Sequence, residues 1–142
     1  MTIARLIEGR TAAIQTCDVG IRVGDAISML AERRIGAMPV MVNGAVAGIF
    51  SERDVVYQLH AHGPDVLDRP VGEVMTAPPV TVEPETEVLA ALSLMTRRRI
   101  RHLPVMDQDR MIAFISIGDL VKYRVDRIES EAEAMRAYIQ TA

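Results

Sequence analysis

The feature that most constrains the fold of this 142-residue chain is an internal repeat. The segment Arg33–Met41, with the sequence RRIGAMPVM, returns as RRIRHLPVM at Arg98–Met106, and a Ser-x-x-Asp motif begins ten residues after the end of each segment. The two copies lie 65 positions apart, and residues 33–56 align with residues 98–121 without a gap. Such self-similarity indicates two copies of one small structural unit.

Each copy has the pattern of a β-α-β-β-α unit, with helical periodicity followed by two extended segments around a short turn. In the first copy we expect an extended piece at Ile14–Cys17, a helix at Val23–Arg34, a strand at Ala37–Val42, a turn at Asn43–Gly44, a strand at Val46–Phe50 and a helix at Ser51–His62. In the second copy we expect an extended piece at Val80–Val82, a helix at Glu87–Arg98, a turn at Gln108–Asp109, a strand at Met111–Ile115 and a long helix from Ser116.

The unit boundaries follow from these elements and from the breakers between them. We expect an N-terminal helical segment at residues 1–12, the first repeat at 13–62, a linker at 63–77, the second repeat at 78–125 and a C-terminal helical extension at 126–142.

Composition and charge exclude several classes of protein. The net charge is −3 and the chain has no Trp, two Phe and three Tyr, so neither a basic face nor base-stacking residues for nucleic acid are expected. No uncharged apolar run approaches the roughly 20 residues that span a membrane, and the N-terminus lacks the apolar core of a signal peptide. The single cysteine, Cys17, cannot form an intrachain disulfide. We therefore expect a cytoplasmic protein.

No pattern typical of an enzyme or a metal site is present. The sequence has no P-loop, no GxGxxG and no Ser-His-Asp arrangement. His60 and His62 are two residues apart, a spacing that places them on different faces of a helix. We expect neither catalysis nor a metal.

The segments IGAMPV…GIFSERDV and IRHLPV…AFISIGDLV resemble the CBS domain, and the pair resembles a Bateman module of the small, stand-alone bacterial type. The resemblance covers about residues 13–125. It implies an α/β (α+β) fold of two tandem repeats packed with pseudo-twofold symmetry, with two clefts between them. It also implies a homodimer, and regulatory binding of adenosyl ligands: AMP, ADP or ATP most often, and S-adenosylmethionine or NAD(H) in some members.

In the family, the hydroxyl and the Asp of each motif hold the ribose, which assigns that role to Ser51 and Asp54 and, in the second copy, to Ser116 and Asp119. The local chemistry agrees, because an ionised carboxylate accepts hydrogen bonds and a ribose offers two neighbouring hydroxyl donors. The alternative is a helix-capping box, in which Ser caps the helix and the acid reaches back to it. The two roles can coexist.

Other candidates also follow from the resemblance. Arg101 and His102 match the phosphate-side positions of the family, and Arg53 can also point into a cleft. Thr16 and Thr81, on the first strands, are candidates for lining adenine or ribose, or are ordinary strand residues. Arg97 and Arg98 are interpreted as a solvated basic patch.

The two copies are not equivalent at these positions. The differences, first copy before second, are Gly36 against Arg101, Ala37 against His102, Gly48 against Ala113, and Arg53 against Gly118. One cleft is therefore expected to bind better than the other, or alone, and the sequence does not say which.

The C-terminal helix carries a further pattern. Apolar residues recur at a spacing of 4-3-4-3-4, typical of a helix that packs on a partner, and the alternative is packing on its own repeat. These residues are Val121, Val125, Ile128, Ala132, Met135 and Ile139. At 1.5 Å per residue this helix would be about 37 Å long, which exceeds one small domain.

These observations predict a dimeric regulatory module that binds an adenine nucleotide and signals its level to an unidentified partner. The alternative is a ligand-free structural dimer that acts as an interaction scaffold.

Overall fold

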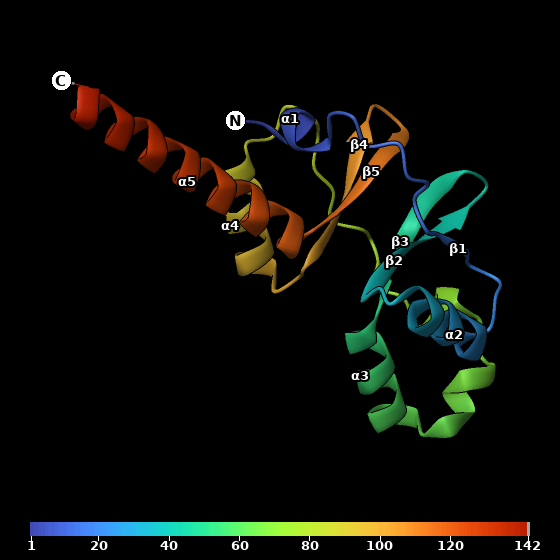
Figure 1. Cartoon of the computed structure of the whole chain (residues 1–142). Helices are drawn as coiled ribbons and strands as arrows, with labels where there is room; N and C mark the ends of the chain where they lie inside the picture. The colour runs from blue at the N-terminus through green and yellow to red at the C-terminus, as the bar shows by residue number, and fades with distance from the viewer. Residues whose placement is uncertain (142) are drawn as a thin grey trace.

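The computed structural model describes residues 1–141, and Figure 1 shows the arrangement of its elements. In chain order the elements are α1 (Ile3–Ile7), β1 (Cys17–Asp18), α2 (Val23–Arg33), β2 (Ala37–Val42), β3 (Ala45–Ser51), α3 (Glu52–His62), η1 (Pro64–Asp68), η2 (Val71–Glu73), α4 (Val88–Arg98), β4 (His102–Asp107), β5 (Arg110–Ser116) and α5 (Ile117–Thr141).

The first repeat forms a three-stranded sheet in the order β1-β2-β3. Strand β1 pairs with β2 in parallel, with Cys17 opposite Val40, and β2 pairs with β3 in an antiparallel hairpin. Asn43 and Gly44 at the hairpin turn have φ values of 49° and 80°. A two-residue turn with both φ values positive matches the twist of the flanking strands, which explains the Asn-Gly pair.

The second repeat forms the equivalent hairpin from β4 and β5. Its first strand is reduced to one parallel bridge, between Val82 and Val105. These two residues are the counterparts of Cys17 and Val40, 65 positions later. The predicted β-α-β-β-α order, repeated twice, and the mixed α/β class are therefore confirmed.

Helices α2 and α4 bury corresponding faces. Ala26 and Leu30 of α2 lie in the core of the first repeat, and Ala91 and Met95 of α4 lie in the core of the second. Burial of such a face supplies most of a short helix's stability.

The segments that precede the two repeats each pack on the opposite repeat. Ile3, in α1, is completely buried in the core of the second repeat, and its N–H donates to the carbonyl of Thr86 at 2.8 Å. Val66, Val71 and Val74, which precede the second repeat, lie in the core of the first. This exchange holds the repeats together and positions the segments that cross between them.

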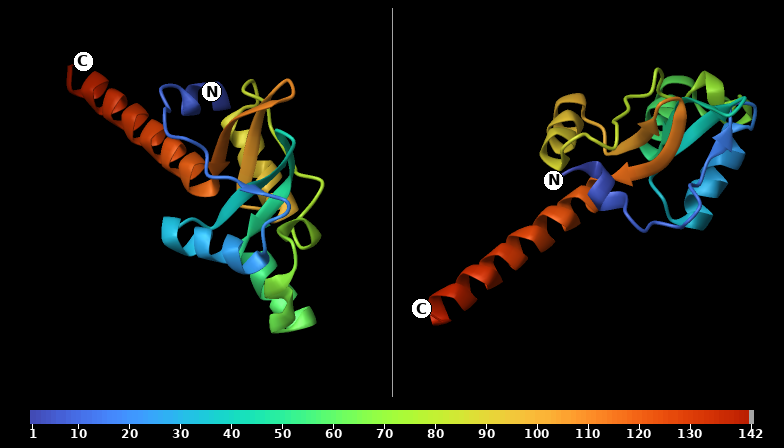
Figure 2. Two further views of the ribbon diagram at one scale, coloured as in Figure 1. Left: turned by 90° about the vertical axis from the view of Figure 1, so that its right-hand side faces the viewer. Right: turned by 90° about the horizontal axis from the view of Figure 1, so that it is seen from above.

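Helix α5 extends away from both repeats (Figures 1 and 2). It contains 25 residues, and Leu120 is the residue in it that is buried.

Candidate functional site

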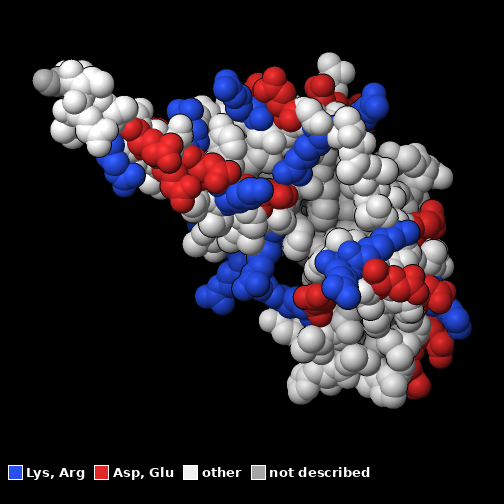
Figure 3. Space-filling view, viewed as in Figure 1, with Lys and Arg blue, Asp and Glu red and all other residues white. Residues whose placement is uncertain are grey.

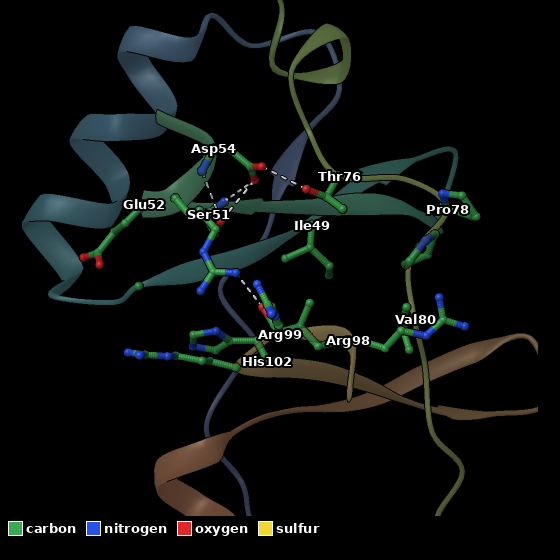
Figure 4. Close-up of a pocket in the computed structure, with 15 residues that line it drawn as sticks. Ile49, Ser51, Glu52, Asp54, Thr76, Pro78, Val80, Arg98, Arg99 and His102 are labelled. Atoms are coloured by element: carbon green, nitrogen blue, oxygen red, sulfur yellow. Dashed lines mark hydrogen bonds between the residues drawn. The ribbon is translucent and has the colours of Figure 1, made fainter. Parts of the chain in front are cut away.

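Two cavities lie between the repeats. Cleft 1 has a volume of about 600 Å³ and is shown in Figure 4. It is lined by Gly36, Ile49, Ser51, Glu52, Arg53, Asp54, Thr76, Pro78, Pro79, Val80, Arg98, Arg99, Ile100, Arg101 and His102. The first repeat, the crossing segment before the second repeat, and the second repeat itself all contribute to its walls.

The Ser51 and Asp54 side chains form a capping box at the start of α3. The Asp54 Oδ2 accepts the Ser51 backbone N–H at 2.9 Å and the Ser51 hydroxyl at 3.1 Å. The Asp54 N–H in turn donates to the Ser51 Oγ at 3.4 Å. The capping interpretation of this motif is therefore geometrically satisfied. It also fixes the Asp54 carboxylate in one orientation at the wall of cleft 1.

Thr76 completes the surroundings of this carboxylate. Its hydroxyl donates to the Asp54 Oδ1 at 2.8 Å, the contact drawn in Figure 4. Two backbone hydrogen bonds to β3 hold Thr76 there. The Thr76 N–H donates to the Ile49 carbonyl at 2.9 Å, and the Ile49 N–H donates to the Thr76 carbonyl at 3.0 Å. Sequence patterns did not single out Thr76, because its contact spans 22 residues.

Gly48 is the residue that permits this bridge. A Cβ atom at Gly48 would lie 2.7 Å from the Thr76 carbonyl oxygen and 2.7 Å from the Met75 Sδ. A side chain there would push the crossing segment away from β3, since a backbone oxygen cannot give way at that distance. Gly48 therefore determines how close Thr76 comes to Asp54.

The opposite wall of cleft 1 is basic and comes from the second repeat. Arg98 ends α4, Arg99 follows it in the left-handed conformation with φ 55°, and Arg101 precedes β4. Arg53, from the first repeat, reaches across to the Arg99 carbonyl at 2.5 Å. Figure 3 shows Lys and Arg side chains gathered where the two repeats meet. Arg98, interpreted from the sequence as part of a solvated basic patch, is exposed and also lines the cavity.

His102 is half-buried beside these arginines. Its ring stacks on Phe114, with centroids 5.4 Å apart and an interplanar angle of 13°. Burial lowers the pKa of His102 below its ordinary value, and the nearby Arg101 contributes in the same direction, whereas Asp119 and Glu52 oppose the shift. His102 is therefore a neutral ring near pH 7, and the positive charge of the cleft comes from arginine.

Cleft 2 has a volume of about 540 Å³ and a different lining. It is lined by Arg10, Thr11, Ala12, Ala13, Ile14, Gln15, Ile35, Ala37, Ile112, Ala113 and Phe114. The second Ser-x-x-Asp motif also forms a capping box: the Asp119 Oδ2 accepts the Ser116 N–H at 2.9 Å, and the Asp119 N–H donates to the Ser116 Oγ at 3.1 Å.

The Asp119 carboxylate has a charged partner, whereas Asp54 forms no ion pair with any of residues 1–141. The Arg10 Nη2 lies 3.3 Å from the Asp119 Oδ1. Ala113 stands where the first repeat has Gly48, and the described residues contain no bridge between Thr11 and Phe114 equivalent to that between Thr76 and Ile49. The segment before the first repeat thus approaches its cleft through an ion pair instead of a backbone bridge.

The predicted site residues divide as follows. Ser51, Arg53, Asp54, Arg101 and His102 line cleft 1, whereas Ser116 and Asp119 are not among the residues that line cleft 2. Thr16 and Thr81 line neither cavity, and the threonines that do, Thr76 and Thr11, lie five residues earlier.

Residues 1–141 contain no group of three or more His, Cys, Asp or Glu side chains placed to hold a metal. In the same residues no helix is both long enough and apolar enough to cross a membrane. Burial raises the pKa of the Cys17 thiol to about 11, so this thiol is unreactive near neutral pH.

Comparison with known proteins identifies the fold and the family. The family model of the CBS domain matches residues 10–61 and 71–126. The CBS domain-containing protein CBSX3, mitochondrial, of Arabidopsis thaliana is 39% identical over 129 residues, which are 87% of this chain and 63% of that relative. This chain therefore spans less than two thirds of that protein. The CBS domain-containing protein YhcV of Bacillus subtilis is 31% identical over 110 residues, 78% of each chain.

Solved structures give the same result. A CBS-domain protein from Burkholderia ambifaria has a TM-score of 0.83 and 36% identity, covering 89% of this chain and 95% of that one. More distant similarity, with a TM-score of 0.74 and 23% identity, links the fold to CBSX2 in complex with AMP, over 88% of this chain and 96% of that one. The chain belongs to the CBS domain family and consists of two such domains in tandem.

Proposed function

We propose that this protein is a regulatory module that binds an adenine nucleotide in cleft 1. The ribose lies at Asp54, Ser51 and Thr76, and the phosphates lie at the arginines of the opposite wall. The observation that carries the proposal is the pairing, in one cavity of about 600 Å³, of an oriented carboxylate with a basic wall from the other repeat.

The Asp54 carboxylate has capacity for the ribose. A carboxylate offers about four acceptor positions on its two oxygens. Oδ2 accepts two hydrogen bonds from Ser51, and Oδ1 accepts one from Thr76. Oδ1 thus retains an acceptor position for a ribose hydroxyl. The Thr76 hydroxyl, which both donates and accepts, can serve the neighbouring one.

Phosphate recognition falls to Arg98, Arg99, Arg101 and Arg53. Arginine presents a fixed fork of N–H donors that suits phosphate oxygens. Neutral His102 adds one donor without charge. The AMP complex of CBSX2 supports the ligand class, since that protein has the same fold.

A ligand in cleft 1 contacts both repeats and so favours one angle between them. If the two repeats can adopt more than one relative angle, the ligand increases the population of the angle that it binds more tightly. The size of this shift is set by the difference between its affinities for the two arrangements. In this proposal the module is a cytoplasmic homodimer without catalytic activity, and a partner protein senses the angle. Residues 13–62 and 78–125 are its two ligand-binding halves, and residues 1–12 and 63–77 are the segments that cross between them.

Thermal unfolding of the full chain with AMP, ADP, ATP, NAD, NADH or S-adenosylmethionine, added one at a time, tests the proposal. A ligand at 100 times its Kd adds about 2.7 kcal/mol to the free energy of unfolding. This raises Tm by a few degrees for a chain of this size. We expect a shift that is absent in Asp54→Asn. No shift with any of these ligands would contradict the proposal and leave the ligand-free scaffold as the function.

A further inference from the structure

Helix α5 exposes apolar side chains that its own repeat does not cover. The exposed fractions are 45% for Val125, 49% for Ile128, 60% for Met135 and 66% for Ile139. The face that packs on the second repeat is a different one, since Leu120 is buried there and Tyr123 packs beside it. The helix therefore has one face on the body and another facing solvent (Figures 1 and 2).

The exposed face follows a heptad repeat. Positions a and d of a heptad, the seam of a coiled coil, are separated alternately by three and four residues. Here the d positions are Val121, Ile128 and Met135, and the a positions are Val125, Ala132 and Ile139. Ala132 is half-buried and the other five are exposed. The seam thus covers nearly three heptads of a helix that is already formed.

Charged residues flank this seam in an ordered way. The e positions are Lys122, Glu129 and Arg136, and the first two g positions are Arg124 and Glu131. Figure 3 shows acidic side chains in the middle of the projecting helix, with basic ones beside them. Charges at e and g set the partner and the orientation of paired helices.

Parallel pairing of two α5 helices satisfies these charges. In a parallel, in-register pair, each g residue faces the e residue five positions later on the partner. Arg124 then faces Glu129, and Glu131 faces Arg136. Each pair occurs twice by symmetry, so four contacts between opposite charges flank the seam.

Antiparallel pairing brings like charges together. With the apolar layers aligned, Val125 of one helix meets Met135 of the other, and e residues face e residues while g residues face g residues. Glu129 then lies near its own copy, as does Glu131, and Lys122 lies near Arg136. The charge pattern therefore distinguishes the two orientations.

We propose that α5 pairs with α5 of a second copy of this chain as a parallel, in-register coiled coil. The helix is anchored before pairing, because Ser116 and Asp119 cap its start and Leu120 fixes its first turn in the core. Anchoring removes the cost of nucleating a short helix. This interface goes beyond the proposed ligand site and does not depend on it.

Cysteine cross-linking of the full chain tests the orientation. Met135→Cys and Val125→Cys are prepared separately and then mixed, under mild oxidation. Native Cys17 is buried, so the wild-type chain serves as the uncross-linked control. We expect each variant to form a disulfide dimer with itself. In-register positions 125 and 135 are ten residues apart, about 15 Å along the helix, so the mixture should yield no mixed dimer.

A mixed dimer formed in place of the self-linked ones would overturn the parallel arrangement. A dimer in solution without cross-links in any sample would place the interface elsewhere, and a monomer in solution would remove the interface altogether.

A charge reversal gives a second measurement. Glu129→Arg places two arginines in contact in the parallel pair, so the dimer Kd by sedimentation should rise severalfold. Adding Arg124→Glu to the same chain restores the opposite charges and should restore the Kd. All of these positions lie outside the core, so circular dichroism should show an unchanged fold. Equal Kd values for the single and double variants would contradict the proposed pairing.

Discussion

Cleft 1 and cleft 2 arise from the same sequence unit, yet the carboxylates of the two Ser-x-x-Asp motifs have different neighbours. Asp54 accepts a hydrogen bond from neutral Thr76 and faces arginines across the cavity, whereas Asp119 is paired with Arg10. The capping boxes that hold the two carboxylates are nearly identical. The difference arises outside the motif, in the crossing segment and the opposite wall.

The contrast shows how a duplicated fold separates its scaffold from its site. Residues within the hairpins are shared by both copies, such as Pro39 and Pro104, or Val40 and Val105. Several positions that face the clefts have diverged, such as Ala37 in cleft 2 against His102 in cleft 1. In cleft 1 they supply cations and a close backbone bridge, and in cleft 2 they supply alanine, isoleucine and Arg10, which pairs with Asp119.

Replacing Gly48 with Ala should have the largest effect on the comparison. The new methyl group would meet the Thr76 carbonyl at 2.7 Å. We expect the free energy of unfolding to fall by about 1–3 kcal/mol, as in other overpacked sites. Nucleotide binding in cleft 1 should weaken as Thr76 moves. Chemical denaturation and calorimetry measure both quantities.

The matched control is Ala113→Gly in the second repeat. This substitution should lower the free energy of unfolding only by the ordinary penalty for glycine in a strand, about 0.5–1 kcal/mol. If the two variants behave alike, Gly48 has no special role in cleft 1.

Arg101→Gln should reduce affinity for a phosphate-bearing nucleotide. A hydrogen bond to a charged group contributes about 1.5–3 kcal/mol, which corresponds to at least about a tenfold loss. Affinity for adenosine should stay the same, because the ribose contacts come from the first repeat. Calorimetry with ATP and with adenosine separates the two effects.

Arg97→Gln is the control for this variant, since Arg97 is an exposed neighbour that does not line cleft 1. An equal loss in both variants would indicate a general effect of charge, not a contact in the cleft.

Arg10→Gln tests the ion pair between Asp119 and Arg10, the member of the pair that lines cleft 2. The two side chains are 39% and 34% exposed, so screening by solvent limits the contribution of the pair to about 0–1 kcal/mol. Stability should therefore fall slightly, and affinity in cleft 1 should not change. Arg5→Gln, at an exposed arginine of α1 five residues earlier, is the control. A lower affinity in cleft 1 after Arg10→Gln would show that the two clefts are coupled.

The smallest effect should be a change in how stability depends on pH. The pKa of His102 is lowered in the folded state, so the folded protein favours the neutral ring. The contribution of this lowered pKa to the free energy of unfolding is complete above the ordinary pKa of about 6.5. It is lost as the pH falls through the lowered pKa of the folded state. His102→Gln should flatten this part of the profile. His60→Gln, at an exposed histidine, should leave the dependence of stability on pH unchanged. Equal flattening by both substitutions would exclude His102 as the cause.

Local patterns predicted the fold well. Strand Ala37–Val42 has the predicted bounds, helix α2 ends one residue earlier than predicted, and Ser51 is the cap before α3 rather than its first helical residue. These features depend on apolar periodicity, on the Asn-Gly turn and on short-range capping, all of which can be read within a few residues.

The surroundings of the site were less predictable, because they depend on contacts between distant segments. Thr76 reaches Asp54 only through the bridge that Gly48 permits, and Arg10 reaches Asp119 from more than a hundred residues away. The sequence showed that the two copies differ at the cleft positions. Assigning the proposed ligand to cleft 1 also required knowing which chain segments cross between the repeats and line each cleft. The identity of the proposed ligand depends on the whole cleft and is not encoded in any local pattern.

The number of nucleotides bound per chain tests the central claim most directly. Titration calorimetry of the wild-type chain with the ligand identified by thermal unfolding should give one site per chain. Asp54→Asn should abolish this binding, and Asp119→Asn should leave it intact. Two sites per chain, or loss of binding in Asp119→Asn with retention in Asp54→Asn, would contradict the assignment of the ligand to cleft 1.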